Sequence, residues 1–173
     1  GYDVTREYYV NDGGNQMLVF NNTLYARYMQ AAGHDLPLPE NAYEGLYVVE
    51  FAEELVSEFG DKWAAVDRDT AIAEIAPIAL ERILAMIRED VALLGIEYDL
   101  WFSEKSLLDN GAFDAAIAQL DDTGHMVDRD GARWFTATEL GEDSDNVVIR
   151  SGEGGPTYFG TDIAYHHDKF ARR

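Results

Sequence analysis

The chain has 173 residues, of which 33 are acidic and 13 are basic, so its formal net charge is −20. This length predicts one domain with a sizeable buried core. Because cysteine is absent, disulfides and thiolate metal sites are excluded, and no apolar run approaches the ~20 residues that span a bilayer. A surface this negative repels phosphate backbones, so we expect neither strong direct binding of nucleic acid by this chain nor membrane association.

The basic residues are ten arginines and three lysines. Abundant Asp and Glu with little Lys is typical of proteins adapted to high salt, where salt screens the self-repulsion. An ordinary acidic cytosolic protein is the simpler alternative, and both interpretations stay open. The chain begins at Gly1 without a charged or apolar leader, directly before a predicted strand, so we expect a piece of a longer protein.

The first forty residues predict a strand followed by a helix. Residues 3–10 are rich in β-forming side chains, and residues 11–16, NDGGNQ, read as a turn. Residues 17–33 place apolar side chains at steps of three and four, and Gly33 ends the pattern. A strand, a turn and a helix make half of a βαβ unit.

Two further helices are predicted after a proline-bearing loop at 34–45. Residues 48–59 form one apolar stripe that ends at Gly60. The longer helix at 70–94 takes Asp69 as its N-cap and carries Pro77 in its second turn, where a kink is expected. Its predicted inward stripe consists of Ile72, Ile75, Ile83, Ile87, Val91 and Leu94.

The next segments alternate between short strands and helices. Residues 96–102 alternate in polarity and predict a strand, and residues 111–124 predict an amphipathic helix. Residues 125–138 predict a hairpin that turns at Asp130-Gly131, with Trp134 buried.

The last segments are a strand at 146–151 and a helix from Thr157 on. Neither an internal repeat nor a low-complexity tract is present. The middle of the chain, residues 41–146, is α+β in character and is flanked by a strand–helix unit on each side. This order predicts an insertion between two pieces, 1–40 and 147–173, of one α/β sheet.

Five blocks of sequence are more specific than these patterns: YYVNDGGNQ (8–16), YEGLYVVEFAEEL (43–55), IEYDLWFSEKSL (96–107), DGARWF (130–135) and VVIRSGEGGPTYFGTDIAYHHDKF (147–170). Together and in this order they resemble the arginyl-tRNA synthetases, which are class I aminoacyl-tRNA synthetases. The resemblance covers nearly the whole chain. It implies an α/β fold, namely a partial Rossmann-type nucleotide-binding domain interrupted by a connective insertion.

Two motifs of that family are missing from this sequence, the HIGH-like motif and the KMSKS-like loop. FSEKSL at 102–107 contains Lys-Ser, but it follows a predicted strand in the insertion and is not that loop. The resemblance implies that the complete, cytoplasmic enzyme joins arginine to ATP, with Mg, giving arginyl-adenylate and pyrophosphate, and then transfers arginine to tRNA(Arg). We expect this piece to supply part of the arginine pocket, to hold no catalytic residue or tightly bound cofactor, and to be inactive alone.

Tyr158 and Asp162 lie four residues apart at the start of the last predicted helix, and therefore on one face of it. A carboxylate can accept two parallel N–H bonds from a guanidinium, and an aromatic ring favours a nearby cation. The pattern alone favours a plainer interpretation, an aromatic side chain at a helix start and an Asp stabilised by the helix dipole. The resemblance implies that both residues recognise arginine.

Three further residues are candidates for lining the cleft. Asp12 and Gln16 follow the first strand, at the edge where α/β sheets collect ligand groups. Alternatively, Asn11 or Asp12 caps the next helix and Gln16 lies in its first turn. His166 is a candidate for a place near the nucleotide in the complete enzyme. Adjacent His166 and His167 diverge by about 100° on a helix, and zinc needs three or four convergent ligands, so we expect no metal site.

A non-catalytic module, which binds an amino acid or docks on a partner, is the alternative function. A reading frame that continues upstream through a HIGH-like motif and downstream through a KMSKS-like loop would favour the enzyme.

The charge predicts that salt stabilises the fold. Raising sodium chloride from 0.1 M to 1 M shortens the Debye length from ~10 Å to ~3 Å, which weakens repulsion between like charges in the compact state. We therefore expect the melting temperature, followed by circular dichroism, to rise between these two concentrations. A flat or falling trend would mean that the charges are well dispersed or locally paired.

Overall fold

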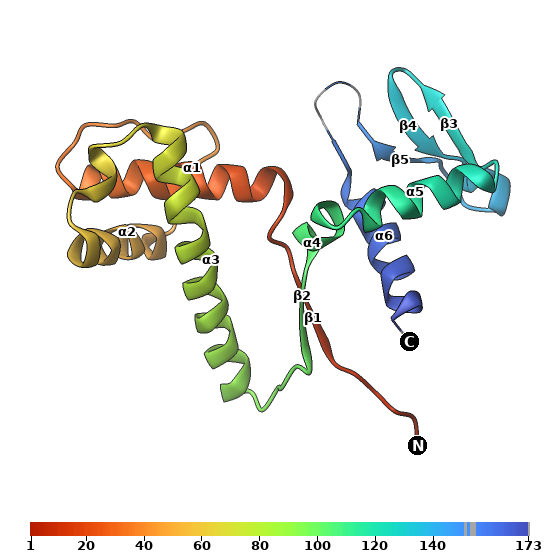
Figure 1. The fold of residues 1–173 in the computed structure, drawn as a ribbon, viewed down its shortest axis with the longest axis horizontal. Coiled ribbons are helices and arrows are strands. Elements are labelled where there is room, and N and C mark those ends of the chain that lie inside the picture. The colour runs from red at the N-terminus through yellow and green to blue at the C-terminus, as the bar shows by residue number, and fades with distance from the viewer. Residues whose placement is uncertain (151, 153–154, 173) are drawn as a thin grey trace. The chain divides into compact units, whose positions relative to one another are not determined.

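The computed structural model describes residues 1–150, 152 and 155–172 (Figure 1). The chain forms two compact units, one of Gly13–Tyr98 and the other of Gly1–Asp12 with the chain from Asp99 onward. The fold is mixed α/β, with a two-stranded parallel sheet and a three-stranded antiparallel sheet. Among the helices of the described residues, none has the length and apolarity that a membrane crossing requires.

The Gly13–Tyr98 unit is helical (Figure 1). Its helices are α1 (Gly14–Ala31), α2 (Leu46–Phe59), the 3-10 helix η1 (Lys62–Ala64) and α3 (Arg68–Leu93). The predicted stripe of α2 is confirmed, because its buried residues are Val48, Phe51, Ala52 and Leu55. They pack with buried side chains of the other helices, including Leu24, Tyr28, Trp63 and Ile75.

The centre of this helical core is an aromatic pair whose polar atoms are all used. The rings of Tyr28 and Trp63 lie edge to face, with centroids 5.3 Å apart. The Tyr28 hydroxyl donates to the Gly60 carbonyl at 2.7 Å and accepts from the Trp63 backbone N–H at 3.2 Å. The Trp63 indole N–H donates to Glu74 at 2.8 Å. Because their polar atoms have hydrogen-bond partners, these buried aromatics stabilise the core and leave no unsatisfied polar group.

Helix α3 differs from its prediction at both ends. Asp67, not Asp69, is the N-cap, because the Asp67 carboxylate accepts from the Thr70 backbone N–H at 3.0 Å and from its hydroxyl at 2.7 Å. The inward stripe is wrong at its far end: Ile75 is buried, whereas Leu94 is 76% exposed. The reason is that α3 packs against the helical core only as far along its length as Ile83.

The other unit contains both sheets. Strand β1 (Glu7–Val10) pairs in parallel with β2 (Leu100–Ser103), so that Val10 lies opposite Ser103. The antiparallel sheet has the order β3-β4-β5. Its strands are β3 (Met126–Arg129), β4 (Ala132–Phe135) and β5 (Asn146–Ile149), and the helices are α4 (Glu104–Asp109), α5 (Ala112–Asp122), the 3-10 helix η2 (Ala137–Leu140) and α6 (Tyr158–Ala171).

The predicted hairpin is confirmed, with positive φ at Asp130 (55°) and Gly131 (75°) as a tight two-residue turn requires. The prediction of a buried Trp134 is wrong. This side chain is half-buried, because it forms a platform for the Arg129 guanidinium, 4.2 Å above its ring, instead of entering the core. Ser151, the last residue of the strand predicted at 146–151, lies outside the described residues. The three-part division at residues 40 and 146 stays a prediction.

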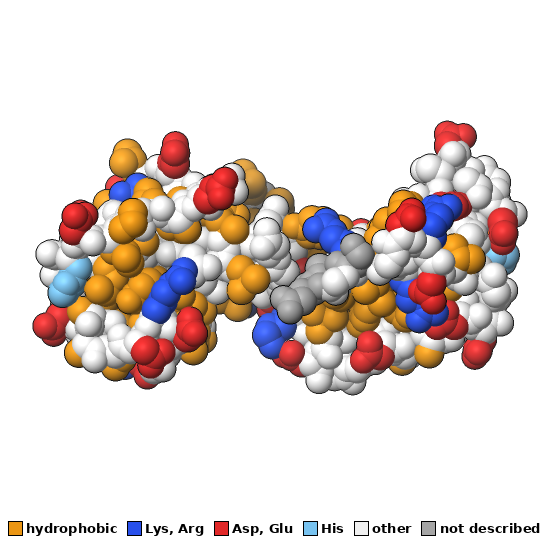
Figure 2. All heavy atoms as spheres, turned by 90° about the horizontal axis from the view of Figure 1, so that it is seen from above, with side chains coloured by type: hydrophobic (Ala, Val, Ile, Leu, Met, Phe, Trp, Pro, Cys, Tyr) orange, Lys and Arg blue, Asp and Glu red, His pale blue; other side chains and the backbone are white. Residues whose placement is uncertain are grey.

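On the face drawn in Figure 2, acidic side chains are spread over the surface with fewer basic side chains between them. The self-repulsion expected from the net charge of −20 is therefore not confined to one patch.

A half-buried ion pair fastens the last helix to the first strand. The side chain of Glu7, 8% exposed, accepts hydrogen bonds from Arg172 at 2.9 Å and from the Tyr165 hydroxyl. Arg172 also pairs with Asp168 at 2.6 Å and lies 4.8 Å over the Phe102 ring. Burial alone would raise the pKa of Glu7, but the hydrogen bonds from Arg172 and Tyr165 outweigh it and hold the pKa below its usual value.

We expect Glu7→Gln to lower the free energy of unfolding by about 1–3 kcal/mol at pH 7, because hydrogen bonds to a charged group are lost. A lowered folded-state pKa stabilises the fold above the unfolded-state value and loses that contribution as the pH falls through the folded-state value. The difference between parent and variant should therefore shrink as the pH falls from 5 to 3. Urea unfolding at both pH values measures it.

The control is Asp109→Asn, which breaks the exposed Lys105–Asp109 pair and should change stability by less than about 0.5 kcal/mol. A Glu7→Gln variant as stable as the parent at pH 7 would contradict the prediction.

Candidate functional site

The start of α6 is held against β5 by Thr157 and Gly160. The Thr157 hydroxyl accepts from the Gly160 backbone N–H at 3.1 Å, which caps the helix. The Thr157 backbone N–H donates to the Val148 carbonyl at 3.0 Å. A Cβ atom at position 160 would lie 2.5 Å from that carbonyl oxygen, so only glycine allows this close approach.

Tyr158, Asp162 and His166 follow one another at steps of four along the exposed side of α6. The opposite side, with Thr161 and Ala164, is buried. The predicted helix and the shared face of Tyr158 and Asp162 are thus confirmed. Their recognition of arginine stays a prediction.

Asp162 is not the only acidic group at this place. Glu104, the first residue of α4, is 5% exposed. Burial, then the negative charge of Glu104 and hydrogen bonding to its carboxylate, and last the charge of Asp162 raise the pKa of the Tyr9 phenol on β1. Both carboxylates therefore lie within electrostatic range of the Tyr9 hydroxyl, and Thr161 lies beside it. We call Tyr9, Glu104, Thr161 and Asp162 the Tyr9 cluster.

The ion pairs within the described part of the chain include neither Glu104 nor Asp162. A buried carboxylate is costly unless a positive charge or several hydrogen bonds compensate it. Of these two carboxylates, that of Glu104 is buried and that of Asp162 lies on the exposed side of α6.

The sequence analysis missed Glu104, although a signal was present. FSEKSL was considered only for its Lys-Ser pair. Glu104 directly follows β2, and Tyr9 lies on β1, which pairs with β2 in parallel. The carboxyl ends of parallel strands share one edge, and ligand groups gather there.

Asp12 holds the helix that begins with Glu104. Its carboxylate accepts from the Ser103 hydroxyl at 2.6 Å and from the Lys105 backbone N–H at 2.9 Å. The interpretation that Asn11 or Asp12 caps α1 is wrong, because the N-cap of α1 is Gly13, without a side-chain hydrogen bond. Asp12 instead fastens α4, and a direct place in the cleft stays a prediction.

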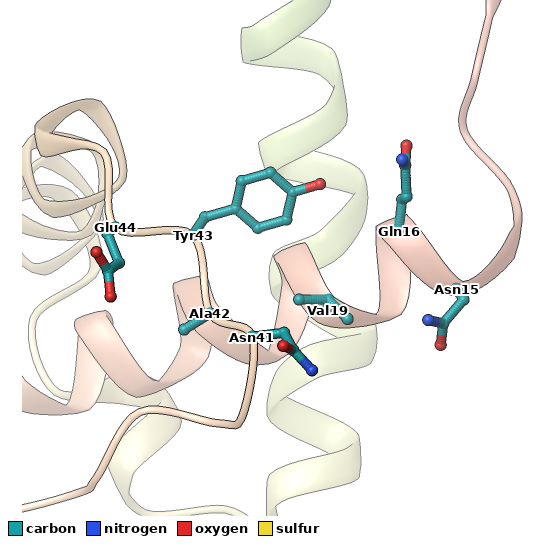
Figure 3. Close-up of a pocket in the computed structure, with 7 residues that line it drawn as sticks. All are labelled: Asn15, Gln16, Val19, Asn41, Ala42, Tyr43 and Glu44. Atoms are coloured by element: carbon teal, nitrogen blue, oxygen red, sulfur yellow. The ribbon is translucent and has the colours of Figure 1, made fainter.

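Gln16 belongs to the other compact unit and lies in the first turn of α1. It lines an open pocket of 540 Å³ between that turn and the loop before α2 (Figure 3). The remaining lining residues are Asn15, Val19, Asn41, Ala42, Tyr43 and Glu44. Gln16 and the Tyr9 cluster thus belong to different compact units, and a place of Gln16 at the edge of the cleft stays a prediction.

The two histidines point to different neighbours. The exposed His166 ring lies 5.6 Å from the Tyr165 ring, whereas His167 Nε2 lies 2.7 Å from the Gln119 amide oxygen. Within the part of the chain that the structure describes, no three His, Cys, Asp or Glu side chains are arranged to hold a metal ion.

No family model matches the chain. An arginine–tRNA ligase from Dehalococcoides mccartyi is 43% identical to it over 173 residues, and one from Moorella thermoacetica is 45% identical over 172 residues. These matches cover 100% and 99% of the chain, but only 31% and 30% of the relatives. The chain thus spans about a third of the length of the curated relatives that it matches.

Two solved structures are similar. A Campylobacter jejuni protein assigned as an arginyl-tRNA synthetase aligns with 99% of this chain and 37% of its own, with a TM-score of 0.83 and 30% identity. The arginyl-tRNA synthetase of Plasmodium falciparum aligns with 95% of this chain and 27% of its own, with a TM-score of 0.59 and 14% identity. The second likeness concerns the fold alone.

Gly160→Ala tests the contact that places α6. Helix propensity alone favours Ala over Gly by about 1 kcal/mol. Because the new Cβ would meet the Val148 carbonyl, we expect the opposite sign, a loss of about 1–3 kcal/mol in the free energy of unfolding. Urea denaturation of parent and variant measures it. A variant that equals or exceeds the parent in stability would show that α6 can shift away from β5 without cost.

Proposed function

The chain belongs to the arginine–tRNA ligase family, and it corresponds to a segment of about a third of the length of the relatives. We propose that it supplies part of the arginine pocket of such an enzyme. In the complete protein, arginine and ATP, with Mg, give arginyl-adenylate and pyrophosphate, and arginine then passes to tRNA(Arg). The parallel pair β1–β2 belongs to a Rossmann-type catalytic domain of that protein. Chemistry of this kind depends on positioning and on stabilised charge.

The observation that supports an arginine pocket is that two carboxylates near Tyr9, those of Glu104 and Asp162, form no ion pair with any described residue. Asp162 stands on the exposed side of α6, and Glu104 is buried at the start of α4. Arginine brings a permanent positive charge and five N–H donors in a fixed plane. Asp162 accepts two parallel N–H bonds from this plane, and Glu104 compensates the charge from the buried side.

Tyr158 completes the recognition from one turn before Asp162. Its exposed ring offers a π face and its hydroxyl offers a hydrogen bond to the guanidinium. Asp12 acts indirectly by fastening α4, while Gln16 and His166 remain candidates for the edge of the cleft. No residue of this chain takes a catalytic role.

The decisive test is steady-state arginylation by the full-length protein that carries this segment, with arginine and ATP varied separately. Asp162→Asn keeps the size but removes the charge and the two-pronged geometry. Removing one member of a buried charge pair costs ~2–5 kcal/mol, so we expect kcat/KM for arginine to fall ~30-fold to several thousand-fold. Glu104→Gln should act in the same direction, and Tyr158→Phe should cost less, ~0.5–2 kcal/mol.

Asp168→Asn is the matched control, because it makes the same substitution on the same helix at a residue that pairs with Arg172. It should leave arginine kinetics unchanged, and KM for ATP should barely move in any variant. If Asp162→Asn stays within about threefold of the parent, less than the ~1 kcal/mol typical of a lost hydrogen bond, Asp162 is a surface residue and the proposed pocket is wrong.

A further inference from the structure

The open pocket of 540 Å³ belongs to the helical unit, and of its lining residues only Gln16 enters the proposed function. Its volume falls in the range of about 300–1,000 Å³ that is common for small-molecule sites. Two segments of the chain form it, the beginning of α1 and the loop before α2 (Figure 3). In that figure the Tyr43 ring extends from the loop toward the beginning of α1.

The polar side chains that line this pocket are not used by the fold. Asn15, Gln16 and Asn41 carry amides, and Glu44 carries a carboxylate. None of these four side chains forms a hydrogen bond or an ion pair with another residue of the described part of the chain. Each amide presents donors and an acceptor side by side, so the pocket suits a ligand whose edge does the same.

The loop side of the pocket is held in place by its own contacts. The Tyr43 backbone N–H donates to the Thr23 hydroxyl of α1 at 3.3 Å. The Tyr43 ring stands nearly at right angles to the buried Phe20 ring, with centroids 5.7 Å apart. Asn41 has a φ of 60°, in the left-handed region that asparagine tolerates better than most residues. The aromatic wall is therefore preformed, which lowers the cost of binding.

The charge of the pocket limits the kind of ligand. Among the described residues that line it, none is Lys or Arg, and Glu44 is the charged one. A phosphate or carboxylate would thus meet repulsion from Glu44 and from the acidic protein as a whole. An aromatic ring, several amides and one carboxylate together suit a flat, uncharged ring system with an exocyclic amine.

We propose that this pocket binds an adenine nucleoside, either free adenosine or the unpaired last residue of an RNA strand. The base stacks on Tyr43, as unpaired bases do on aromatic side chains. An Asn or Gln amide pairs with N6 and N7 of adenine through two hydrogen bonds, and Glu44 accepts the second N6 hydrogen. The phosphates stay outside, which agrees with the expectation that this acidic chain does not bind nucleic acid strongly. The inference does not depend on the arginine pocket.

The test is a titration of the 15N-labelled 173-residue chain with adenosine, followed by NMR. This chain lacks the HIGH-like and KMSKS-like motifs, so these cannot account for binding. We expect the side-chain amide resonances of Gln16 and Asn41 to shift with a dissociation constant of about 1 mM or below. Uridine, which has the ribose but not the adenine edge, should shift them far less.

Asn41→Gly is the decisive variant, because glycine adopts the left-handed backbone freely while the amide is lost. The melting temperature should not fall, and the dissociation constant for adenosine should rise about 10-fold, as for a lost bidentate pair. Gln16→Ala should weaken binding in the same way. The matched control is Gln119→Ala on α5, in the other compact unit, which should leave binding unchanged.

Glu44 is tested through the charge of the ligand. Adenosine monophosphate should bind the parent about threefold more weakly than adenosine, because its phosphate is repelled. Glu44→Gln should narrow this difference. Equal binding of both ligands by the parent would contradict the assigned role of Glu44.

A short single-stranded RNA that ends in adenosine separates the two sources of the ligand. Binding tighter than that of adenosine, and lost when the last residue is uridine, assigns the pocket to a strand end, whereas weaker binding assigns it to the free nucleoside. The proposal is overturned if about 5 mM adenosine, several times the expected dissociation constant, shifts none of these resonances. It is also overturned if uridine binds as well as adenosine, or if neither Asn41→Gly nor Gln16→Ala weakens binding.

Discussion

The parallel pairing of β1 with β2 is the constraint on which the candidate site depends. Glu7 lies opposite Leu100, and the two segments are 93 positions apart in sequence. Closing a loop of this length costs about 4 kcal/mol of chain entropy, as (3/2)RT ln n. The backbone ladder, the ion pair of Glu7 with Arg172, and the bonds of Asp12 to Ser103 and Lys105 together offset it.

Two fastenings of different kinds fix the two carboxylates of the site. Asp12 holds the first turn of α4, and therefore Glu104, through short hydrogen bonds. Gly160 lets α6 approach β5, and so places Asp162 two residues further along the helix. The Asp12 contact consists of hydrogen bonds at the strand ends, whereas the Gly160 contact depends on the absence of a side chain. The positions of the Glu104 and Asp162 carboxylates therefore depend on Asp12 and Gly160, which are not themselves the carboxylates of the site.

Local patterns in the sequence predicted most elements and only part of the site. The apolar stripe of α2, the hairpin at Asp130-Gly131 and the helix carrying Tyr158 and Asp162 are readable because each depends on neighbours within a few residues. The strands at 3–10 and 96–102 were predicted too long, and Glu104 was missed. The extent of a parallel pairing and the burial of Glu104 depend on contacts between distant segments, which no local window contains.

The pairing of the first strand with one that follows it by 93 positions also orders events during synthesis. The helical unit Gly13–Tyr98 leaves the ribosome complete before β2 does, so it can fold while β1 is still without its neighbour. In that interval β1 has emerged before its neighbour, and an exposed apolar strand is the kind of segment that associates with other nascent chains. Charged residues at the start of this strand, Arg6 and Glu7, are of the kind that disfavours such association.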